Sequence, residues 1–221
     1  MTATRVTLAP DPDAQRIYQD LAARDDGLAR LIARHGQPDP FSWSVLDAAV
    51  GGDPFAELAF HIVSQQISTR AALTIYDRLR ALLGAGIDPG RIIATPVEEL
   101  RSIGLSGAKA RSLLDPASRV NDGSLSFAAL ARDDDATAEK LLTTVRGVGP
   151  WSAQMFLLHH FRRPDIFPSA DIGLLRSAQS AFALPDRPTP IELQARAERW
   201  RPFRSYAAAL LWAHGQSSAT T

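Results

Sequence analysis

The 221-residue chain contains no cysteine. This absence excludes disulfide bonds, structural zinc held by thiolates and iron–sulfur clusters. No apolar run approaches the roughly 18 residues that a membrane-spanning helix needs, and the N-terminal MTATRVTLAPDPDAQ lacks the apolar core of a signal peptide. We therefore expect a soluble, intracellular protein that contacts no membrane, either cytoplasmic (bacterial-type, nucleoid-associated) or nuclear.

An excess of charge is also lacking, because 24 basic residues balance 24 acidic ones. Zero net charge counts against nucleic-acid binding, although the distribution of charge matters more than its sum. Arginine supplies nearly all the basic residues, and a coding bias explains this preference as readily as function does; Lys109 and Lys140 are the only lysines. Four arginines gather in one short segment: Arg196, Arg199, Arg201 and Arg204.

Alternating strand patterns are missing as well, whereas apolar residues recur at helical spacing. One helical segment is expected over about 12–34, and another begins after Asp53. Thr95 and Thr189 each precede a proline and, three positions on, a glutamate, which predicts two capping boxes. The last helix should end at Gly215. The sequence thus predicts an all-α fold.

The stretch VRGVGPWSAQMFLLHH places Gly147, Val148 and Gly149 between two helical patterns. Glycines tolerate positive φ and close backbone approach, and Pro150 suits the first position of a helix. The amides of the turn and the positive helix end would then suit a phosphate. A dinucleotide fingerprint would need a glycine where Ser152 stands, and no P-loop motif occurs. A tight helical hairpin without any ligand fits the same pattern.

Five stretches together resemble a known family. LLTTVRGVGPWSAQ and RRPDIFPSADIGLLR resemble the hairpin and the Pro-and-Asp loop of the helix-hairpin-helix/Gly-Pro-Asp superfamily of DNA glycosylases. Three further stretches are similar to its 3-methyladenine DNA glycosylase II branch: WRPFRSYAAALLW, IVSQQISTRAA and LRSIGLSGAKARSL. The resemblance extends from about Asp53 to Trp212.

This resemblance implies one glycosylase unit over 1–221, built from two helical subdomains with a cleft between them. One subdomain would cover 53–161 and contain the hairpin at 137–161, and the other would combine 1–45 with 168–221. Members of the branch that lack an N-terminal β-domain exist, and this chain looks like one of them.

The family's catalytic aspartate falls on Asp171. Breaking an N-glycosidic bond leaves positive charge on the sugar, which a carboxylate can stabilise while it orients or deprotonates the attacking water. Without the motif, Asp171 would be interpreted as an ordinary helix N-cap. Asp165 is the rival carboxylate and is interpreted as a loop residue. Trp151 occupies the position where lyase-type members carry a lysine, so no Schiff base and no strand cleavage are expected.

The remaining site residues also come from the resemblance. Trp151 and Trp212 match base-stacking positions, and an indole face attracts a cationic base; a tyrosine of the best-known members is replaced here by Met155, a departure that bears on base selectivity. Gln66 matches the wedge that fills the gap left by a flipped base. From pattern alone, the tryptophans would be core residues, and Gln65 and Gln66 would be solvated residues on a helix.

The amides of Gly147 and Gly149 would anchor the DNA. The matching hairpin carbonyls, which would hold a monovalent cation, belong to Thr143, Val145 and Val148. No other cofactor is required, and the histidines show no metal-ligand spacing.

The resemblance implies a monomeric, monofunctional DNA glycosylase in base excision repair. It would hydrolyse the N-glycosidic bond of alkylated purines, 3-methyladenine and 7-methylguanine, in double-stranded DNA. One alternative is a non-catalytic helix-hairpin-helix module that binds DNA, which would not need Asp171 in its loop. Another is a glycosylase of the same superfamily for uracil, thymine mismatches or oxidised guanine, which the WRPFRSYAA stretch disfavours.

Overall fold

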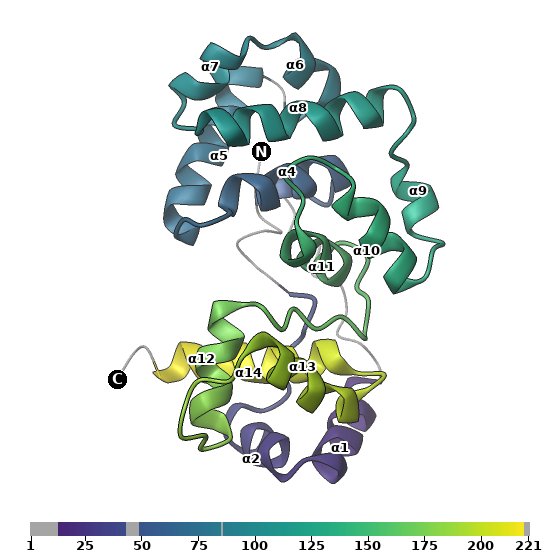
Figure 1. The fold of residues 1–221 in the computed structure, drawn as a ribbon, viewed down its shortest axis with the longest axis vertical. Coiled ribbons are helices and arrows are strands. Elements are labelled where there is room, and N and C mark those ends of the chain that lie inside the picture. The colour runs from purple at the N-terminus through teal and green to yellow at the C-terminus, as the bar shows by residue number, and fades with distance from the viewer. Residues whose placement is uncertain (1–12, 43–48, 85, 219–221) are drawn as a thin grey trace, which may run out of the picture. The chain divides into compact units, whose positions relative to one another are not determined.

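The computed structural model describes residues 13–42, 49–84 and 86–218. Every regular element within these ranges is a helix (Figure 1), so the all-α prediction is confirmed. The chain forms two compact units: unit 1 combines Met1–Ser42 with Arg162–Thr221, and unit 2 is Trp43–Phe161. None of the helices in the described ranges has the length and apolar character that crossing a membrane requires.

Unit 1 is built around its C-terminal helix. α14 packs against α12 and α2, and a core that includes the fully buried Tyr18, Trp200 and Tyr206 fills the space between the helices. The elements of unit 1 are α1 (Ala14–Arg24), α2 (Asp26–His35), α12 (Ile172–Ala181), α13 (Pro190–Ala197), the 3-10 helix η1 (Glu198–Trp200) and α14 (Arg204–Ser218).

The prediction of a single helix over about 12–34 is wrong, because the structure has two helices that meet at Asp25. Position 12 lies outside the described residues. Asp25 has extended backbone angles, and its buried carboxylate accepts the N–H groups of Gly27 and Leu28. The same carboxylate accepts bonds from Arg196 and from the indole of Trp200, each at 3.2 Å. These distant partners stabilise a break that local helical spacing does not reveal.

Unit 2 is built around α4, whose residues 55–63 are all buried. α4 packs against α5, α8 and α11. The elements of unit 2 are α4 (Pro54–Ser64), α5 (Thr69–Leu83), α6 (Pro89–Ala94), α7 (Val97–Ser102), α8 (Gly107–Asn121), α9 (Phe127–Leu130), α10 (Asp135–Thr143) and α11 (Pro150–His159).

The observed ends of the helices agree with some of the predicted caps and differ from others. Asp53 caps α4, and Thr189 forms the predicted capping box with Glu192, so both predictions are confirmed. The prediction for Thr95 is wrong, because Thr95 ends α6 and its hydroxyl donates to the Arg91 carbonyl instead of capping α7. The prediction for Gly215 is also wrong, since α14 continues to Ser218.

Gly215 serves helix packing instead of helix termination. A Cβ atom at this position would lie 2.3 Å from the Ser177 hydroxyl oxygen and 3.6 Å from the Ser177 Cβ atom, so a larger residue would require this hydroxyl to rotate away.

Candidate functional site

Asp171 lies at the N-terminus of α12, and its Oδ1 accepts two hydrogen bonds. The Leu174 amide donates at 2.9 Å, and the Trp212 indole Nε1–H donates from α14 at 3.0 Å. The N-cap prediction is therefore confirmed, and the tryptophan fixes the orientation of the same carboxylate. Among the predicted site residues of unit 1, the fold thus brings Asp171 and Trp212 into direct contact.

Gly173 permits this arrangement, and sequence reasoning missed it. A Cβ atom there would lie 2.9 Å from Asp171 Oδ1 and 3.6 Å from Trp212 Cδ1. Contacts under 3 Å to a fixed carboxylate would displace it, so glycine at this helical position keeps Asp171 and Trp212 together.

The rival carboxylate Asp165 is held by ion pairs. Arg204 is largely buried and grips Asp165 with its Nε at 2.8 Å and its Nη2 at 3.0 Å, and Arg201 Nη1 adds a contact at 2.6 Å. Ser205 clamps the same loop, because its hydroxyl donates to the Arg163 carbonyl and accepts the Ile166 amide. Asp165 is a loop residue, as expected, and its role is to fix the loop that leads to Asp171.

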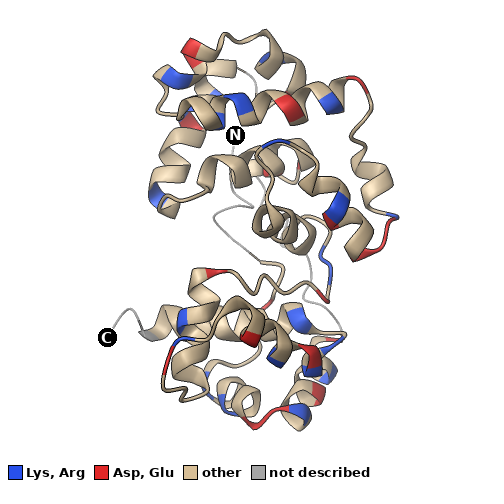
Figure 2. Ribbon diagram, in the orientation of Figure 1, with Lys and Arg blue, Asp and Glu red and all other residues tan. Residues whose placement is uncertain are grey.

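The arginines that gather at 196–204 take part in these internal pairs. Arg196 and Arg199 lie against the Asp25 carboxylate at 3.2 Å and 4.0 Å, and Arg201 and Arg204 contact Asp165. Figure 2 shows basic and acidic positions interspersed within each unit. The local excess of arginine is therefore used to hold unit 1 together.

The hairpin of unit 2 joins α10 to α11, and its two glycines differ. Gly147 has φ +84°, and a Cβ atom there would lie 2.3 Å from the Cβ of Ser112 on α8. Gly149 has φ −85°, precedes Pro150 as the N-cap of α11, and has open space around it. Positive φ and close approach are thus required at Gly147 alone.

Side chains from α8 fix the hairpin from one side. The Asp115 carboxylate accepts the Arg146 amide at 2.8 Å and Arg119 Nε at 3.0 Å, and Arg119 Nη2 donates to the Thr144 carbonyl at 3.1 Å. None of these residues was predicted to take part in the site. Asp115 and Arg119 lie four positions apart on α8, and this spacing is the only feature of the sequence that could have indicated their contact.

The turn of the hairpin offers two kinds of backbone polar group, amides and carbonyls. Within the described part of the chain, no hydrogen bond engages the amides of Gly147 and Gly149, while the Val148 amide donates to the Val145 carbonyl at 3.0 Å. Thr143, Val145 and Val148, whose carbonyls would hold a cation, all lie in the α10–α11 hairpin. Over the described ranges, no cluster of three or more His, Asp or Glu side chains could hold a metal ion.

Trp151 and Met155 lie one turn apart on α11, in unit 2. Trp151 is half-buried and its ring stands edge-on to His61 at a centroid distance of 6.5 Å, and Met155 is buried. The third predicted pocket residue, Trp212, belongs to unit 1.

His61, which packs against Trp151, also lies beside a buried acidic residue, Glu57, that the sequence did not indicate. Glu57 on α4 contacts His160 at 3.0 Å and His61 at 3.7 Å. Burial alone would raise the pKa of Glu57, but the hydrogen bond with His160 and the nearby His61 outweigh it and lower this pKa. Glu57 is therefore a stable carboxylate within unit 2.

Gln65 and Gln66 lie beyond the end of α4, so the alternative that places them on a helix is wrong. Gln65 is half-buried, and its Nε2 donates to the Gly147 carbonyl at 2.7 Å and to the Ser152 hydroxyl at 2.8 Å. Gln66 is exposed and has φ +57°.

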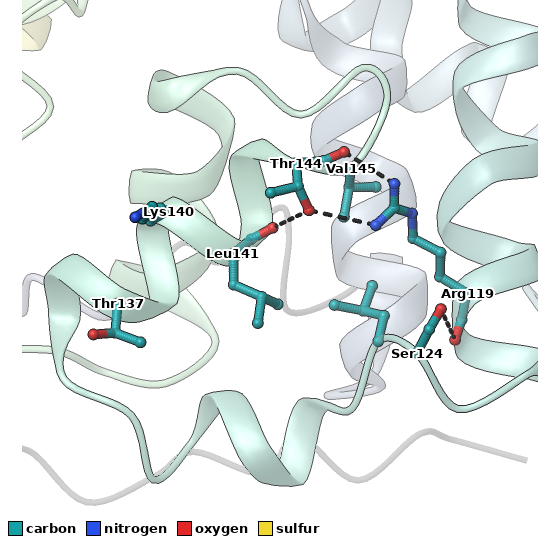
Figure 3. A pocket seen from close by; sticks show the side chains of 8 residues that line it. Arg119, Ser124, Thr137, Lys140, Leu141, Thr144 and Val145 are labelled. Carbon is teal, nitrogen blue, oxygen red and sulfur yellow. Dashed lines mark hydrogen bonds between the residues drawn. The ribbon is translucent and has the colours of Figure 1, made fainter.

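A surface pocket of about 370 Å³ lies beside the hairpin (Figure 3). Its apolar part comes from Leu125, Leu141 and Val145. Arg119 lies at its edge, where it bonds to Thr144. Asp171, Trp151, Met155 and Trp212 take no part in it.

Two helices joined by a tight glycine turn form a helix-hairpin-helix motif, and an aspartate that caps a later helix follows it in the chain. Residues 60–202 match the family described as "HhH-GPD superfamily base excision DNA repair protein". The chain belongs to this helix-hairpin-helix/Gly-Pro-Asp superfamily.

Curated relatives agree with this assignment. The chain is 32% identical over 158 residues to the putative DNA-3-methyladenine glycosylase YfjP of Bacillus subtilis, covering 68% of this chain and 55% of that protein. It is 28% identical to DNA-3-methyladenine glycosylase 2 of Escherichia coli, covering 72% and 57%. The chain thus spans about half the length of these relatives.

Solved structures are also similar. The 3-methyladenine DNA glycosylase Mag1 of Schizosaccharomyces pombe, in complex with abasic DNA, gives a TM-score of 0.79 at 26% identity, covering 89% of this chain and 95% of that one. A DNA-3-methyladenine glycosidase from Bacillus halodurans gives 0.77 at 27% identity, covering 95% and 92%.

The two hairpin glycines give a matched pair of variants. We expect Gly147→Ala to lower the free energy of unfolding by about 1–3 kcal/mol, because it adds strain at positive φ and a clash with Ser112. Gly149→Ala should cost less than about 1 kcal/mol, since its backbone angles suit alanine and its surroundings are open. Urea denaturation of both variants measures the difference, and equal losses would contradict the observed turn geometry.

Proposed function

We propose that this protein is a monofunctional DNA glycosylase that hydrolyses the N-glycosidic bond of alkylated purines in duplex DNA. The proposal depends above all on Asp171, whose carboxylate is oriented by two N–H donors at the start of α12. Asp165 is engaged by Arg201 and Arg204, which favours Asp171 over Asp165 as the catalytic acid. The names of the relatives support 3-methyladenine as substrate. We include 7-methylguanine because it is also a cationic purine, whose charge suits an indole face.

The chemistry follows from the position of one negative charge. Departure of the base leaves positive charge on the sugar, and the Asp171 carboxylate stabilises that charge. The same carboxylate orients or deprotonates the water that attacks the sugar. Because Leu174 and Trp212 already hold Oδ1, the group needs little rearrangement during the reaction.

The proposed reaction stops at base removal. Strand cleavage by a lyase needs an amine that attacks the sugar, and Trp151 at the second position of α11 cannot form a Schiff base. Of the two lysines, Lys109 donates to the carbonyls of Val63 and Gln65, and Lys140 lies on α10.

DNA binding is assigned to unit 2. The amides of Gly147 and Gly149 bind a backbone phosphate, and a monovalent cation on the carbonyls of Thr143, Val145 and Val148 supports the same turn. The exposed Gln66 fills the space left by the flipped base. The protein acts as a monomer and requires no other cofactor.

A panel of duplexes, each with a single lesion, tests the proposed function. We expect rapid release of 3-methyladenine and 7-methylguanine, slow or absent release of hypoxanthine, and no release of 8-oxoguanine. Cationic purines leave more easily, and their charge suits an indole face. Strands should break only after alkali treatment. Rapid 8-oxoguanine release, or strand breaks without alkali, would refute the proposed substrate class or reaction.

Two substitutions separate the roles of Trp212. Trp212→Phe removes the N–H donor to Asp171 but keeps an aromatic face, although one that attracts cations less strongly, so excision of cationic bases should slow only slightly more than excision of neutral ones. Trp212→Ala also removes the face and should slow cationic bases by about a further tenfold relative to neutral ones, given about 0.5–2 kcal/mol for a cation–π contact. Single-turnover rates measure this ratio, and equal losses with alanine would show that Trp212 stacks on no cationic base.

A further inference from the structure

The turn between α4 and α5, residues 65–68, contains an unusual backbone conformation. Gln66 has φ +57°, in the left-handed region that residues with a Cβ atom rarely adopt. Such a conformation persists only where surrounding contacts hold it in place. Gln66 is itself exposed, so these contacts must come from its neighbours.

Lys109 supplies the first set of contacts. It lies in the first turn of α8, and its Nζ donates to the Val63 carbonyl at 2.8 Å and to the Gln65 carbonyl at 2.7 Å. Carbonyls at the end of a helix lack partners within the helix and carry partial negative charge. Partial burial lowers the pKa of Lys109, as expected for an ammonium group enclosed by the end of α4. Lys109 therefore joins the end of α4 to α8.

Gln65 supplies the second set. Its Nε2 uses both hydrogens, one to the Gly147 carbonyl at 2.7 Å and one to the Ser152 hydroxyl at 2.8 Å. Gly147 is the hairpin glycine that needs positive φ, and Ser152 lies in the first turn of α11. One side chain thus connects the residue before Gln66 to both sides of the hairpin.

We propose that Lys109 and Gln65 are positioning residues that lock Gln66 to the hairpin. Together they hold the left-handed turn in one conformation, so that the wedge and the phosphate-binding turn enter DNA as one rigid body. The role given to Gln66 rests on the proposed function. The lock itself is a property of unit 2 and is measurable without DNA.

The lock is tested first in the free protein. Because the chain has no cysteine, Gln66→Cys provides a single attachment point for a nitroxide spin label. The label's rotational rate should rise at least about twofold when Lys109→Met or Gln65→Ala is added, since loop motion on the nanosecond scale is then released. Lys109→Arg should restore much of the order, because it keeps the charge and the donors.

The second lysine gives a matched control. Lys140→Met also removes a lysine ammonium from unit 2 but should leave the label unchanged. Thermal melting confirms that each variant is folded, and Gln65→Ala tests the lock from the hairpin side if Lys109→Met does not fold. Equal mobility of the label in Gln65→Ala and in its parent would overturn the proposal.

Single-turnover excision then tests what the lock does. On a duplex with a paired 3-methyladenine, Lys109→Met should slow excision by about tenfold, because small displacements of positioning groups have large effects on rate. The loss should shrink when the lesion lies opposite an abasic site, where flipping is easier. Adding Lys109→Met to Gln66→Ala should slow excision by less than about threefold, since the two residues act together.

The coupling to Gln66 would be overturned if Lys109→Met slowed excision equally on both duplexes and if its effect multiplied with that of Gln66→Ala in the double variant. A wild-type protein that excises no lesion refutes the proposed function instead, and the spin-label result then still decides whether the lock exists.

Discussion

The contact between Asp171 and Trp212 is the interaction on which the account of unit 1 depends. One oxygen of the carboxylate receives an N–H from its own helix and another from the indole on α14. The segment from Trp200 to Trp212 contacts two further aspartates of unit 1 besides Asp171. Trp200 bonds to Asp25, Arg204 holds Asp165, and Trp212 reaches Asp171. Residues 200–212 thus bond to three aspartates of unit 1, one of which is Asp171.

Unit 2 shows the same design around a backbone turn. Asp115 and Arg119 hold the hairpin from α8, and Gln65 holds it from the end of α4. Within the described part of the chain no hydrogen bond engages the amides of Gly147 and Gly149, and we propose that they bind a DNA phosphate. The proposed binding site is thereby organised without DNA, which would reduce the entropy lost on binding.

The sequence predicted those helix caps that depend only on neighbouring residues. Asp53, Asp171 and Thr189 cap the helices that they precede, because a side-chain oxygen needs only the amides two or three positions ahead. The family resemblance supplied the superfamily and the candidate residues, which composition and spacing alone could not give.

The failures have long-range causes. Arg196 and Trp200 bond to the carboxylate at the Asp25 break, and Ser177 of α12 lies against Gly215, where α14 continues to Ser218. The contacts of Lys109 and Gln65 join residues far apart in the chain, so helical periodicity gave no sign of them.

The most direct test of the central claim replaces the carboxylate of Asp171 with an amide. Asp171→Asn keeps the size and an acceptor for the Leu174 and Trp212 donors but removes the charge. Single-turnover excision of 3-methyladenine should fall by a factor of about a hundred or more, as for loss of a group that stabilises transition-state charge. Affinity for an abasic-site duplex should stay within about threefold, since phosphate contacts dominate binding. Near-wild-type excision by this variant would contradict the account and assign the chemistry to another acid.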